Sequence, residues 1–86
     1  MKTNGHDLFP SQVVGRFLLK GGVYFEVTKE MAAELERFFP DVDIEATLRR
    51  EIEPYCWGLE EQERYTKRGA KRFLVRWLRS EQEKAA

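Results

Sequence analysis

The sequence has few of the residues on which catalysis, metal binding and covalent cross-linking depend, with one cysteine and one histidine among 86 residues. Cys56 has no partner for an internal disulfide, so the sequence is compatible with a protein that resides in a reducing compartment. His6 lies in a polar stretch without the additional ligands of a metal site. We therefore expect no metal, no cofactor and no catalytic residue, and we interpret Cys56 as a small buried apolar side chain.

Long apolar runs are also missing from the sequence. No segment approaches the roughly 20 apolar residues that cross a bilayer, and residues 1–10 lack the apolar core of a signal peptide. We expect a soluble cytoplasmic protein that makes no contact with membranes and is not an enzyme.

The charges are unevenly distributed along the chain, although Lys+Arg and Asp+Glu both total 15 and the net charge is zero. Residues 26–63 contain 12 acidic and four basic side chains, whereas residues 64–79 contain seven basic side chains and no acid. The two regions are expected to prefer partners of opposite charge.

The residue pattern predicts a single small α+β domain, in which an N-terminal β-hairpin is followed by a three-helix bundle. We expect a flexible arm over residues 1–11, the domain over 12–80 and a charged tail over 81–86. Residues 13–19 and 23–27 are rich in β-branched and aromatic side chains, which is typical of strands. Gly21 and Gly22 between them supply the positive φ angles of a two-residue hairpin turn.

Three residues are expected to cap the helices. Thr28 precedes a first helix that Pro40 ends, Asp43 precedes a second, and Thr66 precedes a third. Pro54 lies within the second helical segment, where the missing N–H and the ring predict a kink or a break.

The third helix has two different faces. Residues 70, 73, 74, 77 and 78 form an apolar stripe at helical spacing. The opposite side carries Arg68, Lys71, Arg72, Arg76 and Arg79, with Lys67 in the first turn and Arg64 in the preceding loop. Like charges four residues apart cost a helix about 0.2–0.5 kcal/mol per pair, so this face is not explained by helix stability.

The basic side of this helix has three interpretations. Guanidinium groups suit phosphates, which indicates a nucleic-acid surface. Two other interpretations remain open: neutralisation by the acidic segment 26–63, or a solvated face without a partner.

Aromatic side chains offer a second candidate surface. The apolar stripe favours a core position for Trp77, whereas Trp57 lies in an irregular stretch and is the better candidate for an exposed ring. Trp57 is followed by Glu60, Glu61 and Glu63, and we interpret these four residues as a region that contacts a protein partner.

The pattern Thr66-x-x-Gly69-x-x-Arg72-Phe73-x-x-x-Trp77-Leu78 is the most specific in the sequence. Together with Leu19-Lys20-Gly21-Gly22 and Phe39-Pro40, it resembles the C-terminal module of phage and prophage replication proteins, the replisome organisers and helicase-loader-like initiators, over about residues 17–80. The resemblance implies a role in replication inside a bacterial host cell. Residues 54–63 depart from that module, because acids replace its usual bases, which leaves room for a protein partner.

Two functions follow as hypotheses. The first is a phage-type replication accessory module that binds a replisome protein, or nucleic acid without sequence specificity, or both. Its phosphate contacts are expected from Arg64, Lys67, Arg68, Lys71, Arg72, Arg76 and Arg79. The second is a phage-encoded protein-interaction module that modulates or inhibits a host replication or defence complex, as anti-CRISPR proteins do. No small-molecule substrate is expected in either case, and a homo-oligomer is possible.

Overall fold

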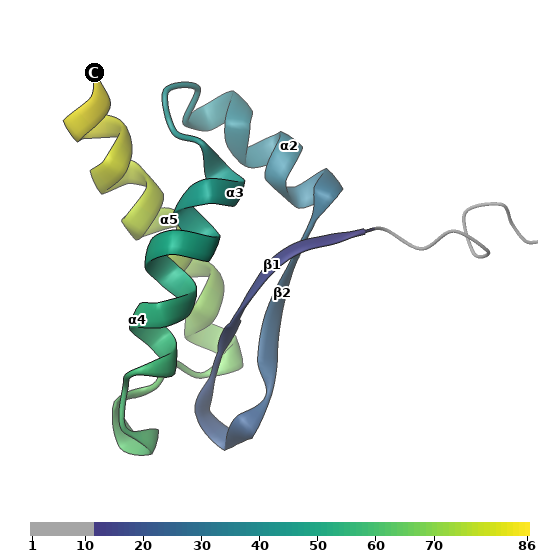
Figure 1. Ribbon diagram of the computed structural model, residues 1–86, viewed down its shortest axis with the longest axis vertical. Coiled ribbons are helices and arrows are strands. Elements are labelled where there is room, and N and C mark those ends of the chain that lie inside the picture. Colours follow the sequence, from purple (N-terminus) through teal and green to yellow (C-terminus); the bar gives the residue numbers. More distant parts are fainter. Residues whose placement is uncertain (1–11) are drawn as a thin grey trace, which may run out of the picture.

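The computed structural model describes residues 12–86, which form a two-stranded hairpin followed by three helical segments (Figure 1). The elements are β1 (Val13–Leu18), β2 (Tyr24–Thr28), α2 (Lys29–Phe38), α3 (Ile44–Thr47), α4 (Glu53–Trp57) and α5 (Lys67–Ala85). A π-helical turn at Leu48–Ile52 joins α3 to α4, and short 3-10 turns lie at Lys20–Gly22 and Glu61–Glu63. The predicted α+β fold is confirmed; the predicted arm over residues 1–11 lies outside the described residues.

The two strands are antiparallel, and their turn differs from the predicted one by a residue. Leu18 pairs with Tyr24, and the N–H of Leu19 donates to the carbonyl of Val23 at 2.7 Å. The turn therefore contains three residues rather than two. Gly21 and Gly22 have φ angles of 86° and 76°, which confirms the predicted need for positive φ at both positions.

Gly15 is the point at which the hairpin meets the second helical segment. The strand register shifts between Val13 and Gly15, so β1 carries a bulge there. A Cβ atom at Gly15 would lie 3.0 Å from Leu48 Cδ1 and 3.1 Å from Leu48 Cβ. Glycine at this position therefore lets the strand approach the helix closely.

We expect Gly15→Ala to lower the free energy of unfolding by about 1–3 kcal/mol, because the new methyl group overlaps the side chain of Leu48. Gly58→Ala is the matched control. Its Cβ would meet only ordinary contacts of 3.5 and 3.7 Å, and the φ of Gly58 is −79°. The control is expected to be neutral or slightly stabilising. Urea denaturation of both variants measures the difference, and equal stabilities would contradict the proposed close packing at Gly15.

All three predicted caps are present. The side-chain oxygens of Thr28, Asp43 and Thr66 each accept a hydrogen bond from the backbone N–H three residues later, at 3.2, 3.1 and 3.2 Å. Each cap satisfies one of the N–H groups that the first helical turn leaves without an intrahelical acceptor. The sequence therefore predicted where α2, α3 and α5 begin.

The second helical segment does not break at Pro54. The N–H of Glu53 donates to the carbonyl of Leu48, five residues earlier, and α4 continues directly after this π turn. A π turn is wider than an α turn, which gives room for a residue that has no N–H and whose ring would crowd the carbonyl of Arg50. The disturbance expected at Pro54 thus takes the form of a π turn in a continuous helical column, visible at the centre of Figure 1.

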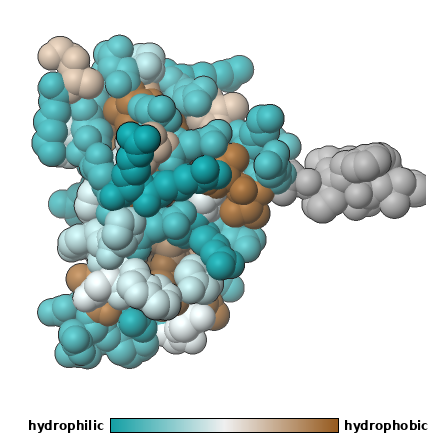
Figure 2. All heavy atoms as spheres, in the orientation of Figure 1, coloured by the Kyte–Doolittle hydropathy of each residue, from teal (hydrophilic) through white to brown (hydrophobic). Residues whose placement is uncertain are grey.

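One core joins the hairpin to all three helical segments. Its fully buried large side chains are Phe17, Leu19, Val27, Ile44, Leu48, Ile52, Leu74 and Leu78. The ring of Phe17 lies 5.1 Å from that of Phe25 and 5.4 Å from that of Phe73, measured between centroids. Phe17 therefore ties β1 to β2 and to α5. Figure 2 shows that hydrophilic residues dominate one face of the molecule, with hydrophobic residues in separate patches.

The last helix extends beyond the predicted end of the domain. α5 continues to Ala85, so residues 81–85 are helical and the boundary drawn at residue 80 does not coincide with a helix end. Gln82 attaches this part to the loop before α3: its Oε1 accepts from the N–H of Asp41 at 2.9 Å, and its Nε2 donates to Asp41 Oδ2 at 2.7 Å. These two bonds set where the end of α5 lies.

Candidate nucleic-acid interface

The orientation of α5 follows from its apolar stripe. Ala70, Phe73, Leu74 and Leu78 are buried, so the opposite side of the helix is turned to solvent. We call this side the basic face; it consists of Arg68, Lys71, Arg72, Arg76 and Arg79, and all five side chains are exposed. The helical spacing in the sequence therefore predicted the exposed basic side correctly, and the buried side correctly except for Trp77, which is half-buried.

None of these five cations forms an ion pair with a carboxylate of the described residues. The two ion pairs that join described residues to one another are Arg64–Glu61 at 2.8 Å and Lys84–Glu81 at 3.3 Å. Glu34 of α2 lines a cavity together with Lys71 and Arg79 but forms no ion pair with either. Across residues 12–86, one-for-one neutralisation of the basic face by the acidic segment does not occur.

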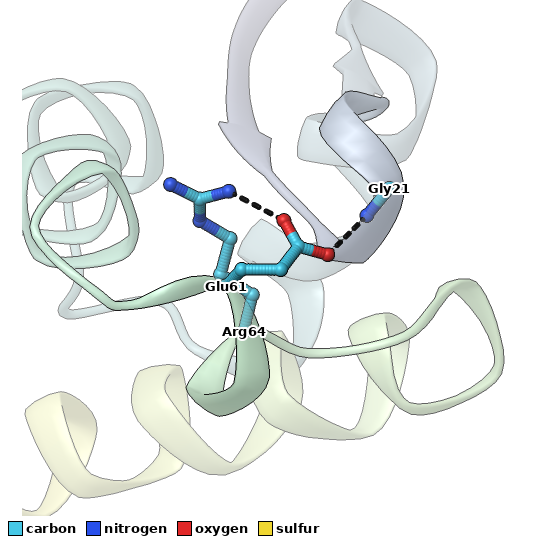
Figure 3. A network of polar contacts seen from close by, with 3 residues as sticks. All are labelled: Gly21, Glu61 and Arg64. Carbon is cyan, nitrogen blue, oxygen red and sulfur yellow. Dashed lines mark hydrogen bonds and ion pairs between the residues drawn. The ribbon is translucent and has the colours of Figure 1, made fainter.

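Arg64 differs from the other predicted phosphate ligands. It is half-buried, and its Nη1 donates to Glu61 Oε1 at 2.8 Å. The other oxygen of that carboxylate accepts from the N–H of Gly21 at 2.9 Å, so Glu61 links the turn before α5 to the hairpin turn (Figure 3). Arg64 therefore supports the fold, whereas Lys67, in the first turn of α5, is exposed and extends the basic face.

The four residues predicted to contact a protein partner are all exposed, but they differ in whether their side chains already form contacts within the chain. Trp57 is 67% exposed at the end of α4, and Glu60 and Glu63 are exposed in the following turn. Glu61 is exposed as well, but both of its carboxylate oxygens already accept hydrogen bonds within the chain. Of the three glutamates, Glu60 and Glu63 are therefore the ones better placed to meet a partner.

An aromatic cluster of Tyr55, Tyr65, Phe73 and Trp77 lies beside the basic face; the sequence predicted the apolar stripe that contains Phe73 and Trp77, but not their contacts with the two tyrosines. The ring of Tyr65 stacks on that of Phe73, with centroids 4.1 Å apart and planes 19° apart. The ring of Tyr55 lies 6.2 Å from Phe73 and 5.2 Å from Trp77. Trp77 is half-buried at the edge of the core, and its expected core position is only partly right.

Comparison with known protein families, curated proteins and solved structures finds no match to this chain. Within residues 12–86, no helix has both the length and the apolar character that crossing a membrane requires. The case for a function therefore rests on the geometry and the charges of the surface.

Two pKa values reflect the packing around the aromatic cluster. Burial and the neighbouring Tyr55 raise the pKa of the Tyr65 hydroxyl, while the positive charge of Arg76 acts in the opposite direction. Burial raises the pKa of the Cys56 thiol from 9.0 to about 11. Cys56 is fully buried in the core, which confirms its interpretation as a small apolar side chain and keeps it protonated at neutral pH.

We expect Cys56 to make folding pH-dependent in the alkaline range. Since its pKa is 9.0 in the unfolded chain and about 11 in the fold, the unfolded state loses the proton first as the pH rises. Stability should be unaffected below pH 9 and should fall by roughly 2–3 kcal/mol between pH 9 and 11. Urea denaturation at several pH values measures this change. A Cys56→Ala variant must lack that component, and an equally steep alkaline loss in the variant would assign it to other groups.

Proposed function

We propose that this protein binds nucleic acid without sequence specificity, as an accessory module of phage-type replication. The observation that carries the proposal is the basic face of α5, with five exposed cations and no internal ion pair to a described carboxylate. Four of the five are arginines, whose planar guanidinium groups fit phosphate oxygens. Phosphate contacts fix the position of a nucleic acid but do not read its sequence.

The energetic cost of the basic face supports an external partner. Arg68 and Arg72 lie four residues apart, as do Arg72 and Arg76, and such like-charge pairs destabilise a helix by about 0.2–0.5 kcal/mol each. Lys67 and Arg68 stand in the first turn, where the helix dipole disfavours positive charge. A bound polyanion would remove both penalties.

The replication role is supported by the resemblance of residues 66–78 to the replication-protein module. Within that pattern, the side chain of Thr66 accepts from the N–H of Gly69, and Phe73 and Leu78 are buried. The shared residues therefore build and anchor the helix, while Arg72 belongs to the surface that we propose for phosphate binding.

A salt titration tests the proposal. About five phosphate contacts correspond to a log–log slope of roughly −3.5 on single strands and −4.5 on duplex, so affinity should fall by about two to three orders of magnitude between 50 and 200 mM salt. Fluorescence anisotropy with labelled oligonucleotides of unrelated sequence measures the slope. Affinity that does not depend on salt, or the absence of any binding at 50 mM salt, would refute the proposed function.

A second candidate function is supported by Trp57, whose ring is 67% exposed beside the exposed acids Glu60 and Glu63. Large aromatic side chains are the residues that protein interfaces favour. In this alternative the protein binds and modulates a host replication or defence complex. It predicts salt-resistant binding to a purified candidate complex that Trp57→Ser abolishes, together with little affinity for free nucleic acid.

A further inference from the structure

A groove of about 440 Å³ runs along α5 between the basic face and the aromatic cluster. Arg72 and Arg76 form its cationic side, and the rings of Tyr65, Phe73 and Trp77 form its aromatic side; Gly69 also lines it. The groove thus places guanidinium groups and ring surfaces within reach of the same ligand.

The aromatic side of the groove retains ring surface for a ligand. Tyr65 uses one face to stack on Phe73, at 4.1 Å between centroids, and the ring itself is half-buried. Trp77 meets Phe73 at 77° and Tyr55 at 59° between ring planes, so it has no parallel stacking partner among the described residues. A planar base is the kind of group that stacks on such rings.

The helix carries an arginine followed by an aromatic residue twice, one turn apart. Arg72 is followed directly by Phe73, and Arg76 by Trp77, so each cation has an aromatic neighbour at nearly the same height on the helix. Phe73 is buried beneath the stacked ring of Tyr65, so Tyr65 is the ring that a ligand beside Arg72 would meet. The two pairs are about 6 Å apart along the axis. This arrangement suits a chain that presents a phosphate and an unpaired base in regular alternation.

We propose that the groove selects single-stranded nucleic acid, with phosphates on Arg72 and Arg76 and bases against Tyr65 and Trp77. This inference rests on the proposed function, since it concerns the same helix face. Phosphate contacts alone would favour duplex, which has the higher charge density and the steeper salt dependence. A duplex keeps its bases stacked inside the helix, so only a single strand gains from the aromatic side of the groove.

The test compares oligodeoxyuridylate, oligouridylate and a duplex of matched length at one salt concentration, because these two single strands differ only in the 2′-hydroxyl of the sugar. A Trp57→Phe background leaves Trp77 as the single tryptophan, so that its emission reports on the groove. We expect tighter binding to the single strands than to the duplex, with saturable quenching of Trp77. A stronger response to one of the two single strands would identify the sugar.

Variants at Tyr65 separate base stacking from charge. Tyr65→Leu removes the ring and should weaken single-strand binding by at least about fivefold, the lower end of the effect of losing one base stack. Tyr65→Phe keeps the ring and should retain single-strand affinity, and neither change should alter duplex binding. Equal affinity for single strands and duplex, with unchanged Trp77 emission, would overturn the inference and leave the proposed function intact. Failure of both nucleic acids to bind at low salt would refute both.

Discussion

An Arg68→Gln/Arg72→Gln/Arg76→Gln/Arg79→Gln variant is expected to bind nucleic acid at least about 100-fold more weakly than the natural chain at 50 mM salt. Each lost phosphate contact removes its share of counterion release, so the slope of log affinity against log salt should fall from about −4.5 to about −1 on duplex. The same anisotropy titrations measure both quantities. The effect should not depend on the sequence of the oligonucleotide, because no base contact is removed.

The matched control changes the net charge by the same amount at other places. Lys20, Lys29, Arg37 and Arg50 are exposed and lie on the hairpin turn, on α2 and on the π turn. Their simultaneous replacement by glutamine should leave most of the affinity and the slope. Equal losses in the two variants would mean that net charge alone drives binding, and the basic face would then have no special role.

The stability of the basic-face variant is a further readout. Removing the like-charge pairs Arg68–Arg72 and Arg72–Arg76 should raise the free energy of unfolding by about 0.4–1 kcal/mol in total. Loss of binding together with a gain in stability is the pattern of a surface kept for a ligand. A clear loss of stability would instead show that these side chains support the fold.

The second large effect is expected for Phe17→Ala, which should lower the free energy of unfolding by about 3–5 kcal/mol. Phe17 is fully buried, and its ring contacts Phe25 of β2 and Phe73 of α5. A domain of this size has a total stability of about 4–13 kcal/mol, so the loss should be a large fraction of the total. Urea denaturation followed by circular dichroism measures the change.

Two other substitutions are controls for Phe17→Ala, one at an exposed phenylalanine and one that keeps most of the side-chain volume. Phe38→Ala makes the same chemical change at a ring that is 74% exposed, and it should alter stability by no more than about 0.5 kcal/mol. Phe17→Leu keeps most of the volume and should cost about 1–2 kcal/mol. A small effect of Phe17→Ala would show that the hairpin and α5 are held together by other contacts.

Local signals in the sequence predicted much of this molecule. Thr28, Asp43 and Thr66 cap their helices as expected, because a cap involves an oxygen and an N–H only three residues apart. The positive φ angles of the glycine pair and the two faces of α5 are likewise set by residues that are close together in the sequence. The candidate site could therefore be predicted as a set of residues on one helix.

Contacts between distant residues were not predictable in this way. Gly15 approaches Leu48 across 33 positions of the sequence, and Glu61 reaches the N–H of Gly21 across 40. The π turn before Pro54 and the stacking of Tyr65 on Phe73 also depend on how the segments pack. Sequence periodicity carries no information about such pairs, because it records only which side of one element is apolar.

The amino-acid order by itself determined that one helix would carry arginines on one side and apolar residues on the other, since both follow from a repeat of 3.6 residues. Only the tertiary structure decided whether those arginines would be covered. The acidic segment is close in the chain and opposite in charge, but α5 is anchored through Phe73, Leu74 and Leu78, which fixes the rotation of the helix about its axis. Burial of these apolar side chains is worth more than any exposed ion pair, so the basic face is left turned to solvent.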